Sequence, residues 1–215
     1  MARLRNGIFF YILVGMGTKG KASETRRHIL NVANEAIHRD GYGAASLSEI
    51  LSGSGLTKGA LYHHFKNKQE LGYALIDEII AEYVDSWWVA PLKDREDPLE
   101  AIAQAIQSRF SDELPLLMRY GCPLGRLSQE LATADEGCRQ RLEVLYRHWR
   151  RSLTQALRQG QHGGSVRADI DSDQAAAFLI AALQGSIAQS RSAQDKSIFQ
   201  ECMGGLSQYL TSLRP

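Results

Sequence analysis

Hydrophobic residues recur at intervals of three and four along most of this chain, which is the spacing of a helix that buries one face. A clear stripe of this kind runs from Ile29 to Ile37, with apolar residues at i, i+3, i+4, i+7 and i+8. We expect this helix to begin near Ser23 or Thr25. It should end at Asp40-Gly41, since glycine commonly follows the last turn of a helix.

The stretch from Ser46 to Phe65 predicts two short helices joined by a tight turn. Gly53-Ser54-Gly55 interrupts the first helix, because glycine adopts the positive φ angles of a sharp turn at little cost. Thr57 is suited to cap a second helix that buries Leu61 and Phe65. The opposite face of this second helix is small, cationic and aromatic, which suits the major groove of DNA. That face carries Lys58, Gly59, Ala60, Tyr62 and His63.

The rest of the chain predicts further helices and no persuasive strand. Asn67 should cap a long helix, with Glu70 completing a capping box, and Pro91 should end it. Asp97-Pro98 should begin the next helix, which continues through Phe110. Later helices are expected at about 124–134, 136–159, 172–190 and 197–213, with short helices or loops at 114–125 and a loop at 159–166. With about nine helices, the predicted fold class is all-α.

Composition narrows the class of protein. Hydrophobic residues make up 44% of the 215 residues, and no apolar run approaches the roughly 18 residues of a membrane span. Three well-separated cysteines argue against a disulfide framework and for the cytoplasm. We find no Gly-x-Ser-x-Gly elbow, no His-Glu-x-x-His motif and no metal-ligand spacing among the six histidines. The sequence therefore predicts no enzyme, no cofactor and no bound metal.

Positive charge is concentrated near the predicted two-helix motif. Residues 1–76 hold ten Lys/Arg and five Asp/Glu, a net charge of +5, whereas residues 77–215 hold fifteen and nineteen, a net charge of −4. The first part can therefore approach DNA phosphates, and the second part is better suited to another task.

The residues Thr25 to Leu30, Gly41-Tyr42 and above all Leu56 to Leu71 resemble the TetR family of transcriptional regulators. The resemblance covers residues 25–75, about a quarter of the chain. It implies a three-helix DNA-binding domain, a C-terminal ligand-binding domain of about six helices, and a homodimer. The expected domains are a flexible or extra segment at 1–22, a helix-turn-helix domain at 23–70 with its motif at 46–65, and a ligand-binding and dimerisation domain at 71–215.

The resemblance also implies which residues bind DNA. The first turn of the second helix would lie in the groove, where Lys58 has the reach and charge for a guanine edge. Its neighbours Gly59 and Ala60 offer little hydrogen bonding, which leaves part of the specificity to DNA shape. Two alternatives stay open: Tyr62 could pack against the first helix, and His64 could be a partly buried helix-face histidine. The predicted DNA-binding residues are Ser46, Thr57, Lys58, Gly59, Ala60, Tyr62, His63, His64, Lys66 and Lys68.

The stretch from Tyr120 to Leu131 is similar to a subgroup of the same family that includes the N-ethylmaleimide-reductase repressor. In that subgroup a cysteine in such a Gly-Cys stretch senses electrophiles or oxidants. Cys122 stands just before a predicted helix, whose N-terminus would stabilise a thiolate, or it is simply a small buried residue. The candidate pocket or sensor residues are Tyr83, Trp87, Phe110, Met118, Tyr120, Cys122 and Trp149, with Trp88 also considered.

Together these features predict a repressor that binds a palindromic DNA operator as a dimer and is released by a small-molecule or electrophilic inducer. The helices at 172–190 and 197–213 would form the dimer interface, because their small residues allow close approach. A helical interaction module that has lost DNA binding is the remaining alternative, which the presence of Lys58, Tyr62 and Lys68 disfavours.

Overall fold

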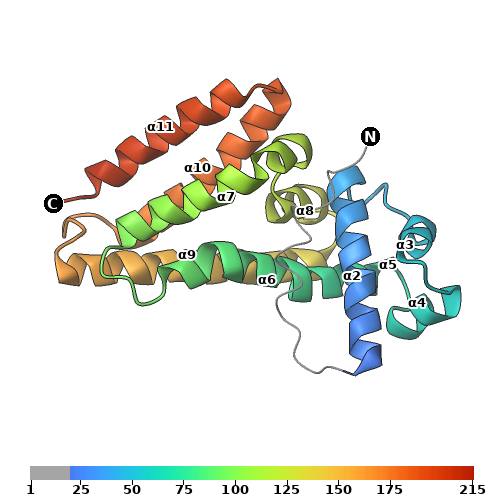
Figure 1. Ribbon diagram of the computed structural model, residues 1–215. Helices are drawn as coiled ribbons and strands as arrows, with labels where there is room; N and C mark the ends of the chain where they lie inside the picture. Colours follow the sequence, from blue (N-terminus) through green and yellow to red (C-terminus); the bar gives the residue numbers. More distant parts are fainter. Residues whose placement is uncertain (1–19) are drawn as a thin grey trace. The chain divides into compact units, whose positions relative to one another are not determined.

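The computed structural model describes residues 20–215, and it is helical throughout with no strand in that range (Figure 1). The expected extra segment at 1–22 lies outside the described residues except for its last three: Gly20 is the N-cap of the first described helix, and Lys21 and Ala22 begin that helix. If the continuous run from Lys68 to Leu92 is counted once, residues 20–215 form nine helices. The all-α prediction is confirmed.

The helical segments have the following first and last residues. They are α2 (Lys21–Asp40), α3 (Leu47–Ser54), α4 (Lys58–His64), α5 (Lys68–Ala74), η2 (Leu75–Ile80), α6 (Ala81–Val84), η3 (Asp85–Val89), η4 (Ala90–Leu92), α7 (Pro98–Tyr120), α8 (Pro123–Leu131), α9 (Glu136–Gly163), α10 (Ser172–Ala193) and α11 (Lys196–Ser212). Here η2 and η3 are π-helical stretches and η4 is a 3₁₀ turn, so α5 to η4 is one helix with two wider segments.

Local side-chain caps explain where several helices start. Asn67 accepts the backbone N–H of Glu70 at 2.8 Å, as predicted for a cap. The carboxylate of Glu70 accepts the N–H of Lys66 at 2.9 Å instead of that of Asn67, so the predicted capping box is only half formed. Asp97 accepts the N–H groups of Leu99 and Glu100 and thereby begins α7 where the sequence places it.

Four boundary predictions are wrong, and one of them is the helix expected at about 124–134, which is α8 and ends at Leu131. The first helix begins at Lys21 and not near Ser23 or Thr25. The break predicted for residues 114–125 does not occur before Tyr120, since α7 continues through Pro115. Pro115 is exposed, while Glu113 and Leu117 on either side are buried, so packing holds the helix together where a hydrogen bond is missing. The predicted loop at 159–166 begins later, because α9 runs on to Gly163.

The described residues divide into two compact units. The first combines residues 20–81 with Arg126–Leu142, so it contains α2 to α5 together with most of α8 and the start of α9. Its core is made by fully buried side chains from α2, α3, α4 and the helix that follows. These include Ile29, Leu30, Ile50, Leu61, Phe65, Leu71 and Leu75.

The second unit combines Glu82–Gly125 with Glu143–Pro215. In this unit α10 packs against α11, and α7 packs against both of them. Trp88 stacks on Trp149 with ring centroids 4.9 Å apart, joining η3 to α9. Among residues 20–215, no helix is both long enough and apolar enough to cross a membrane.

Candidate functional site

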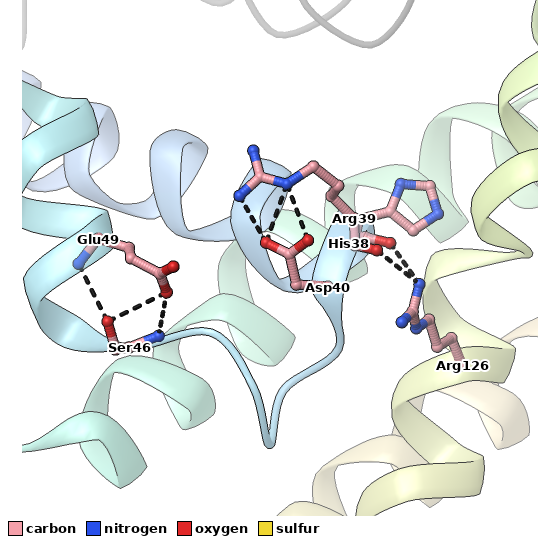
Figure 2. A network of polar contacts seen from close by, with 6 residues as sticks. All are labelled: His38, Arg39, Asp40, Ser46, Glu49 and Arg126. Atoms are coloured by element: carbon pink, nitrogen blue, oxygen red, sulfur yellow. Dashed lines mark hydrogen bonds and ion pairs between the residues drawn. The ribbon is translucent and has the colours of Figure 1, made fainter.

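The N-terminus of α3 is fixed by a complete capping box. Ser46 accepts the N–H of Glu49 at 3.1 Å, and the carboxylate of Glu49 accepts the N–H of Ser46 at 2.9 Å (Figure 2). These contacts lower the pKa of Glu49, chiefly through the backbone N–H of Ser46. Gly55, at φ 67°, ends α3 and turns the chain toward α4. The two predicted short helices are therefore present, with the break at Gly55.

The first turn of α4 is capped and open to solvent. Thr57 is exposed and accepts the N–H of Ala60 at 3.2 Å. Lys58 and Gly59 are exposed, and a Cβ atom added at Gly59 would meet only the Thr57 hydroxyl, at 4.0 Å. Because no side chain projects at Gly59, this part of α4 allows another molecule to approach the helix backbone closely.

Tyr62 and His64, the two aromatic residues of α4 with open alternatives, differ in their exposure. Tyr62 is 43% exposed, with the Lys58 ammonium 5.8 Å from its ring centroid, so packing against the first helix is not supported. His64 is half-buried, and burial, followed by the nearby charges of His63 and Arg26, lowers its pKa. His63 is exposed on the same helix. Tyr62 and His63 are therefore the exposed rings of this helix, and His64 is the partly buried one.

The two lysines after α4 have different surroundings. Lys66 is exposed, 3.9 Å from the carboxylate of Glu70. Lys68 is half-buried: its ammonium donates to the backbone oxygen of Gly43 at 3.1 Å and lies 4.7 Å from the ring centroid of Tyr42. An ammonium has three donors, so Lys68 can hold the turn before α3 and still bind an anion.

Two of the predicted pocket residues meet around a buried cation in the second unit. Arg109 donates to the hydroxyl of Tyr83 at 2.9 and 3.3 Å, and its guanidinium lies 4.7 Å from the ring centroid of Trp87. Glu113 forms an ion pair with Arg109. Burial alone would lower the pKa of Arg109, but Tyr83 and Glu113 raise it by more. Burial strongly raises the pKa of Tyr83, so its hydroxyl stays protonated.

Cys122 lies at this cluster, with two polar side chains facing its sulfur. The amide of Gln184 donates to Sγ at 3.3 Å, and the Tyr83 hydroxyl is 3.9 Å away. Gln184 reaches this position because residue 125 is glycine, where an added Cβ would lie 2.2 Å from the Gln184 side-chain oxygen. Cys122 is buried just before the first residue of α8.

The other predicted pocket residues lie elsewhere in the second unit. Phe110 contacts Phe199 at a centroid distance of 4.5 Å and lines an apolar groove of ≈ 380 Å³ between α7 and α11. Trp149 lies in its stack with Trp88. Met118 and Tyr120 are half-buried near the end of α7. The predicted set is thus not one pocket.

Arg109 was missed by sequence reasoning, although a signal exists. Ile102, Ile106, Arg109, Glu113 and Leu117 follow helical spacing, so an i, i+4 charge pair interrupts an otherwise apolar stripe. Charged residues on a buried helix face are rare unless they are paired. No group of three or more His, Cys, Asp or Glu side chains among residues 20–215 is arranged to hold a metal ion.

Two short, capped helices joined at Gly55, with an exposed cationic face on the second, define a helix-turn-helix DNA-binding protein. Family models agree: residues 29–75 match the bacterial regulatory proteins of the tetR family, and residues 95–206 match the tetracyclin repressor-like C-terminal domain. The chain belongs to the tetR family. It is a DNA-binding transcriptional regulator.

Individual relatives are similar over most of their length. TtgR, a transcriptional regulator of Pseudomonas putida, is 29% identical over 79% of this chain and 81% of its own. DhaR, a transcriptional repressor of a Mycobacterium species, is 26% identical over 75% of this chain and 80% of its own. A TetR family regulator from Cytophaga hutchinsonii shares the fold, with a TM-score of 0.82 at 22% identity over 92% of this chain and 98% of that chain. Reduced NemR of E. coli also shares the fold, with a TM-score of 0.75 at 22% identity over 88% of this chain and 96% of that chain.

Proposed function

We propose that this regulator is a cytoplasmic repressor that binds a palindromic operator as a homodimer and is released when an electrophile modifies Cys122. The exposed first turn of α4 carries the DNA-binding part of the proposal. Lys58 would reach a guanine edge, and Gly59 would let the helix sit close to the groove floor. The similarity of this chain to DhaR, a repressor, favours repression over activation.

Contacts with DNA phosphates would surround the first turn of α4. Ser46 and Thr57 present the capped N-termini of α3 and α4, where backbone N–H groups attract anions. Tyr62 and Lys66 are exposed, and Lys68 keeps donors available. His63 and His64 would lie nearby, with Ala60 at the edge of the groove. These contacts would fix the register of the protein on DNA without specifying bases.

The surface of α10 and α11 supports dimerisation. Phe178 is 50% exposed and packs edge-on against Tyr209, with centroids 4.5 Å apart, so an apolar pair faces solvent in the single chain. A Cβ atom added at Gly185 meets nothing within 4 Å, which leaves room for a second helix to approach. In a two-fold dimer, two copies of α4 would bind the two half-sites of a palindrome, which in helix-turn-helix operators lie about 34 Å, or one turn of DNA, apart.

The surroundings of Cys122 support an electrophilic effector. When its thiol adds to an α,β-unsaturated carbonyl compound, sulfur bonds to the β-carbon and the thiol proton ends on the α-carbon. The Gln184 amide and the Tyr83 hydroxyl are the donors placed to stabilise negative charge during this addition. Cys138 lacks such a setting, because burial and the adjacent Asp135 raise its pKa to about 12. Electrophiles should therefore select Cys122 over Cys138.

The test measures operator binding by fluorescence anisotropy, using duplex DNA from upstream of this protein's own gene, before and after treatment with N-ethylmaleimide. We expect tight, salt-sensitive binding to a palindrome, release on treatment, and a mass adduct on Cys122. The Cys122→Ser variant should bind DNA and resist release, whereas Cys138→Ser and Cys202→Ser should behave like the wild type. Release of Cys122→Ser at the wild-type rate would refute the sensor assignment. Absence of palindrome-dependent binding would refute the operator model.

A further inference from the structure

Arg126, in the first turn of α8, binds the carboxyl end of α2. Its Nη1 donates to the backbone oxygens of His38 at 2.6 Å and Arg39 at 3.4 Å, as Figure 2 shows. The last carbonyl groups of a helix have no partner within the helix and carry partial negative charge, so a cation there is stabilising. The Arg126 side chain is only 15% exposed, so this contact is largely shielded from solvent.

Glu130, one turn further along α8, binds the turn that follows α2. Its Oε2 accepts the backbone N–H of Tyr42 at 2.7 Å and that of Gly43 at 3.3 Å. Its Oε1 accepts from Nε of Arg126 at 3.2 Å. One carboxylate therefore links two backbone amides of the turn to the arginine that holds the preceding helix.

The turn is shaped to receive this pair. Gly41 has a φ of 95°, and a Cβ atom at this position would lie 2.8 Å from Oε1 of Glu130. Only glycine combines that backbone conformation with so close an approach. The chain then leads directly to Ser46, which caps the first helix of the DNA-binding motif.

The same turn is held from its other side by α5. The Tyr42 hydroxyl donates to the backbone oxygen of Lys68 at 3.0 Å, while the Lys68 ammonium donates to that of Gly43 at 3.1 Å. The Tyr42 ring also packs so closely on Gly72 that an added Cβ would be 2.7 Å from a ring carbon. Any shift of the turn therefore reaches Lys68, a proposed phosphate-binding residue.

Arg126 and Glu130 follow Cys122 by four and eight residues, and both lie on the helix that begins directly after this cysteine. We propose that Arg126 and Glu130 are positioning residues: through the turn at 41–43 they set the DNA-binding helices according to the state of α8. The dependence on effector rests on the proposed function, whereas the dependence of operator binding on Glu130 does not.

The experiment compares the wild type with Glu130→Ala and Glu130→Gln, the second of which keeps an acceptor oxygen. Glu136→Ala is the matched control, because Glu136 forms an ion pair with Arg139 on the exposed surface of α9. Amide hydrogen exchange is followed in a peptide spanning 41–45. Operator affinity is measured before and after N-ethylmaleimide treatment.

In Glu130→Ala we expect at least tenfold faster exchange at Tyr42 and Gly43 and at least fivefold weaker operator binding. The ratio of affinities before and after treatment should fall to within twofold of one, although the Cys122 adduct still forms. Glu130→Gln should recover part of each effect, and the control should match the wild type. A purely structural role predicts weaker binding with an unchanged ratio, and that result overturns the positioning role.

Two further outcomes separate this inference from the proposed function. If the wild type binds its operator but ignores N-ethylmaleimide, the effector assignment fails, and exchange and affinity in Glu130→Ala still decide the role of Glu130. If Glu130→Ala keeps wild-type exchange at 41–43 and wild-type affinity, the inference is wrong while operator binding stands.

Discussion

Replacing Glu113 with Leu should destabilise the protein more than the loss of an ordinary surface ion pair. The side chains of Arg109 and Glu113 are 1% and 6% exposed, so the substitution leaves a guanidinium buried without its carboxylate. Removing one partner of a buried ion pair costs about 3–5 kcal/mol. Because Arg109 keeps its hydrogen bonds to Tyr83 and its contact with Trp87, we expect the lower end, about 3 kcal/mol.

The double variant Arg109→Met/Glu113→Leu separates the value of the pair from the cost of breaking it. Replacing both partners with apolar side chains of similar volume is often neutral or stabilising, so stability should return to within about 1 kcal/mol of the wild type. For a chain of this size, the loss in Glu113→Leu corresponds to a fall in Tm of roughly 6–12 °C.

Urea unfolding followed by tryptophan fluorescence measures both variants, because Trp87, Trp88 and Trp149 all belong to the second unit. Protein concentration is held constant, since a dimer makes stability depend on it. A loss below about 1 kcal/mol in Glu113→Leu, or a double variant as unstable as the single one, would contradict the argument from burial. If the pair serves the effector site, the double variant should bind operator normally and respond less to N-ethylmaleimide.

Three other predictions concern separate parts of the chain. Lys58→Ala should weaken operator binding by about 1–3 kcal/mol and relax the preference for guanine at the base pair that Lys58 contacts, whereas exposed Lys93→Ala should change neither. Asp135 accepts hydrogen bonds from the backbone N–H of Cys138 and the side-chain amide of Gln69, and these bonds lower its pKa. Its ionised form therefore stabilises the fold at pH values above the pKa that it has in the unfolded chain. The urea midpoint of the wild type should exceed that of Asp135→Asn near pH 7, and the difference should disappear as the pH falls below about 4. If the proposed dimer forms through α10 and α11, Phe178→Glu should be a monomer when its mass is measured by light scattering, and a dimeric mass would place the interface elsewhere.

Helix starts could be predicted from sequence because their chemistry is local. Thr57, Asn67 and Asp97 each accept a backbone N–H two or three residues later, so residue type and spacing suffice. The turn at Gly55 is local in the same sense. For this reason the two short helices of the predicted motif could be placed from sequence alone.

Features that depend on packing were not predictable in the same way. A proline inside a helix usually kinks or ends it, but α7 continues through Pro115 because buried residues on both sides hold the helix in place. The contacts of Arg126 and Glu130 with the turn at 41–43 join residues 87 or 88 positions apart, and no local pattern announces such a pairing. The predicted pocket residues do not form one site for the same reason: Phe110 packs on Phe199 and Trp149 on Trp88, whereas Cys122 contacts Gln184.

The energy needed for regulation is small enough to come from these few contacts. Coupling between two sites in a protein typically amounts to about 1–3 kcal/mol. A hydrogen bond to a charged group contributes about 1.5–3 kcal/mol, and Glu130 forms two with the turn amides of Tyr42 and Gly43. Loss or lengthening of one of them would therefore shift operator affinity by roughly tenfold or more without unfolding either unit. Cys122 immediately precedes α8, so if the proposed adduct forms there, a small displacement of this helix would be enough to change those bonds.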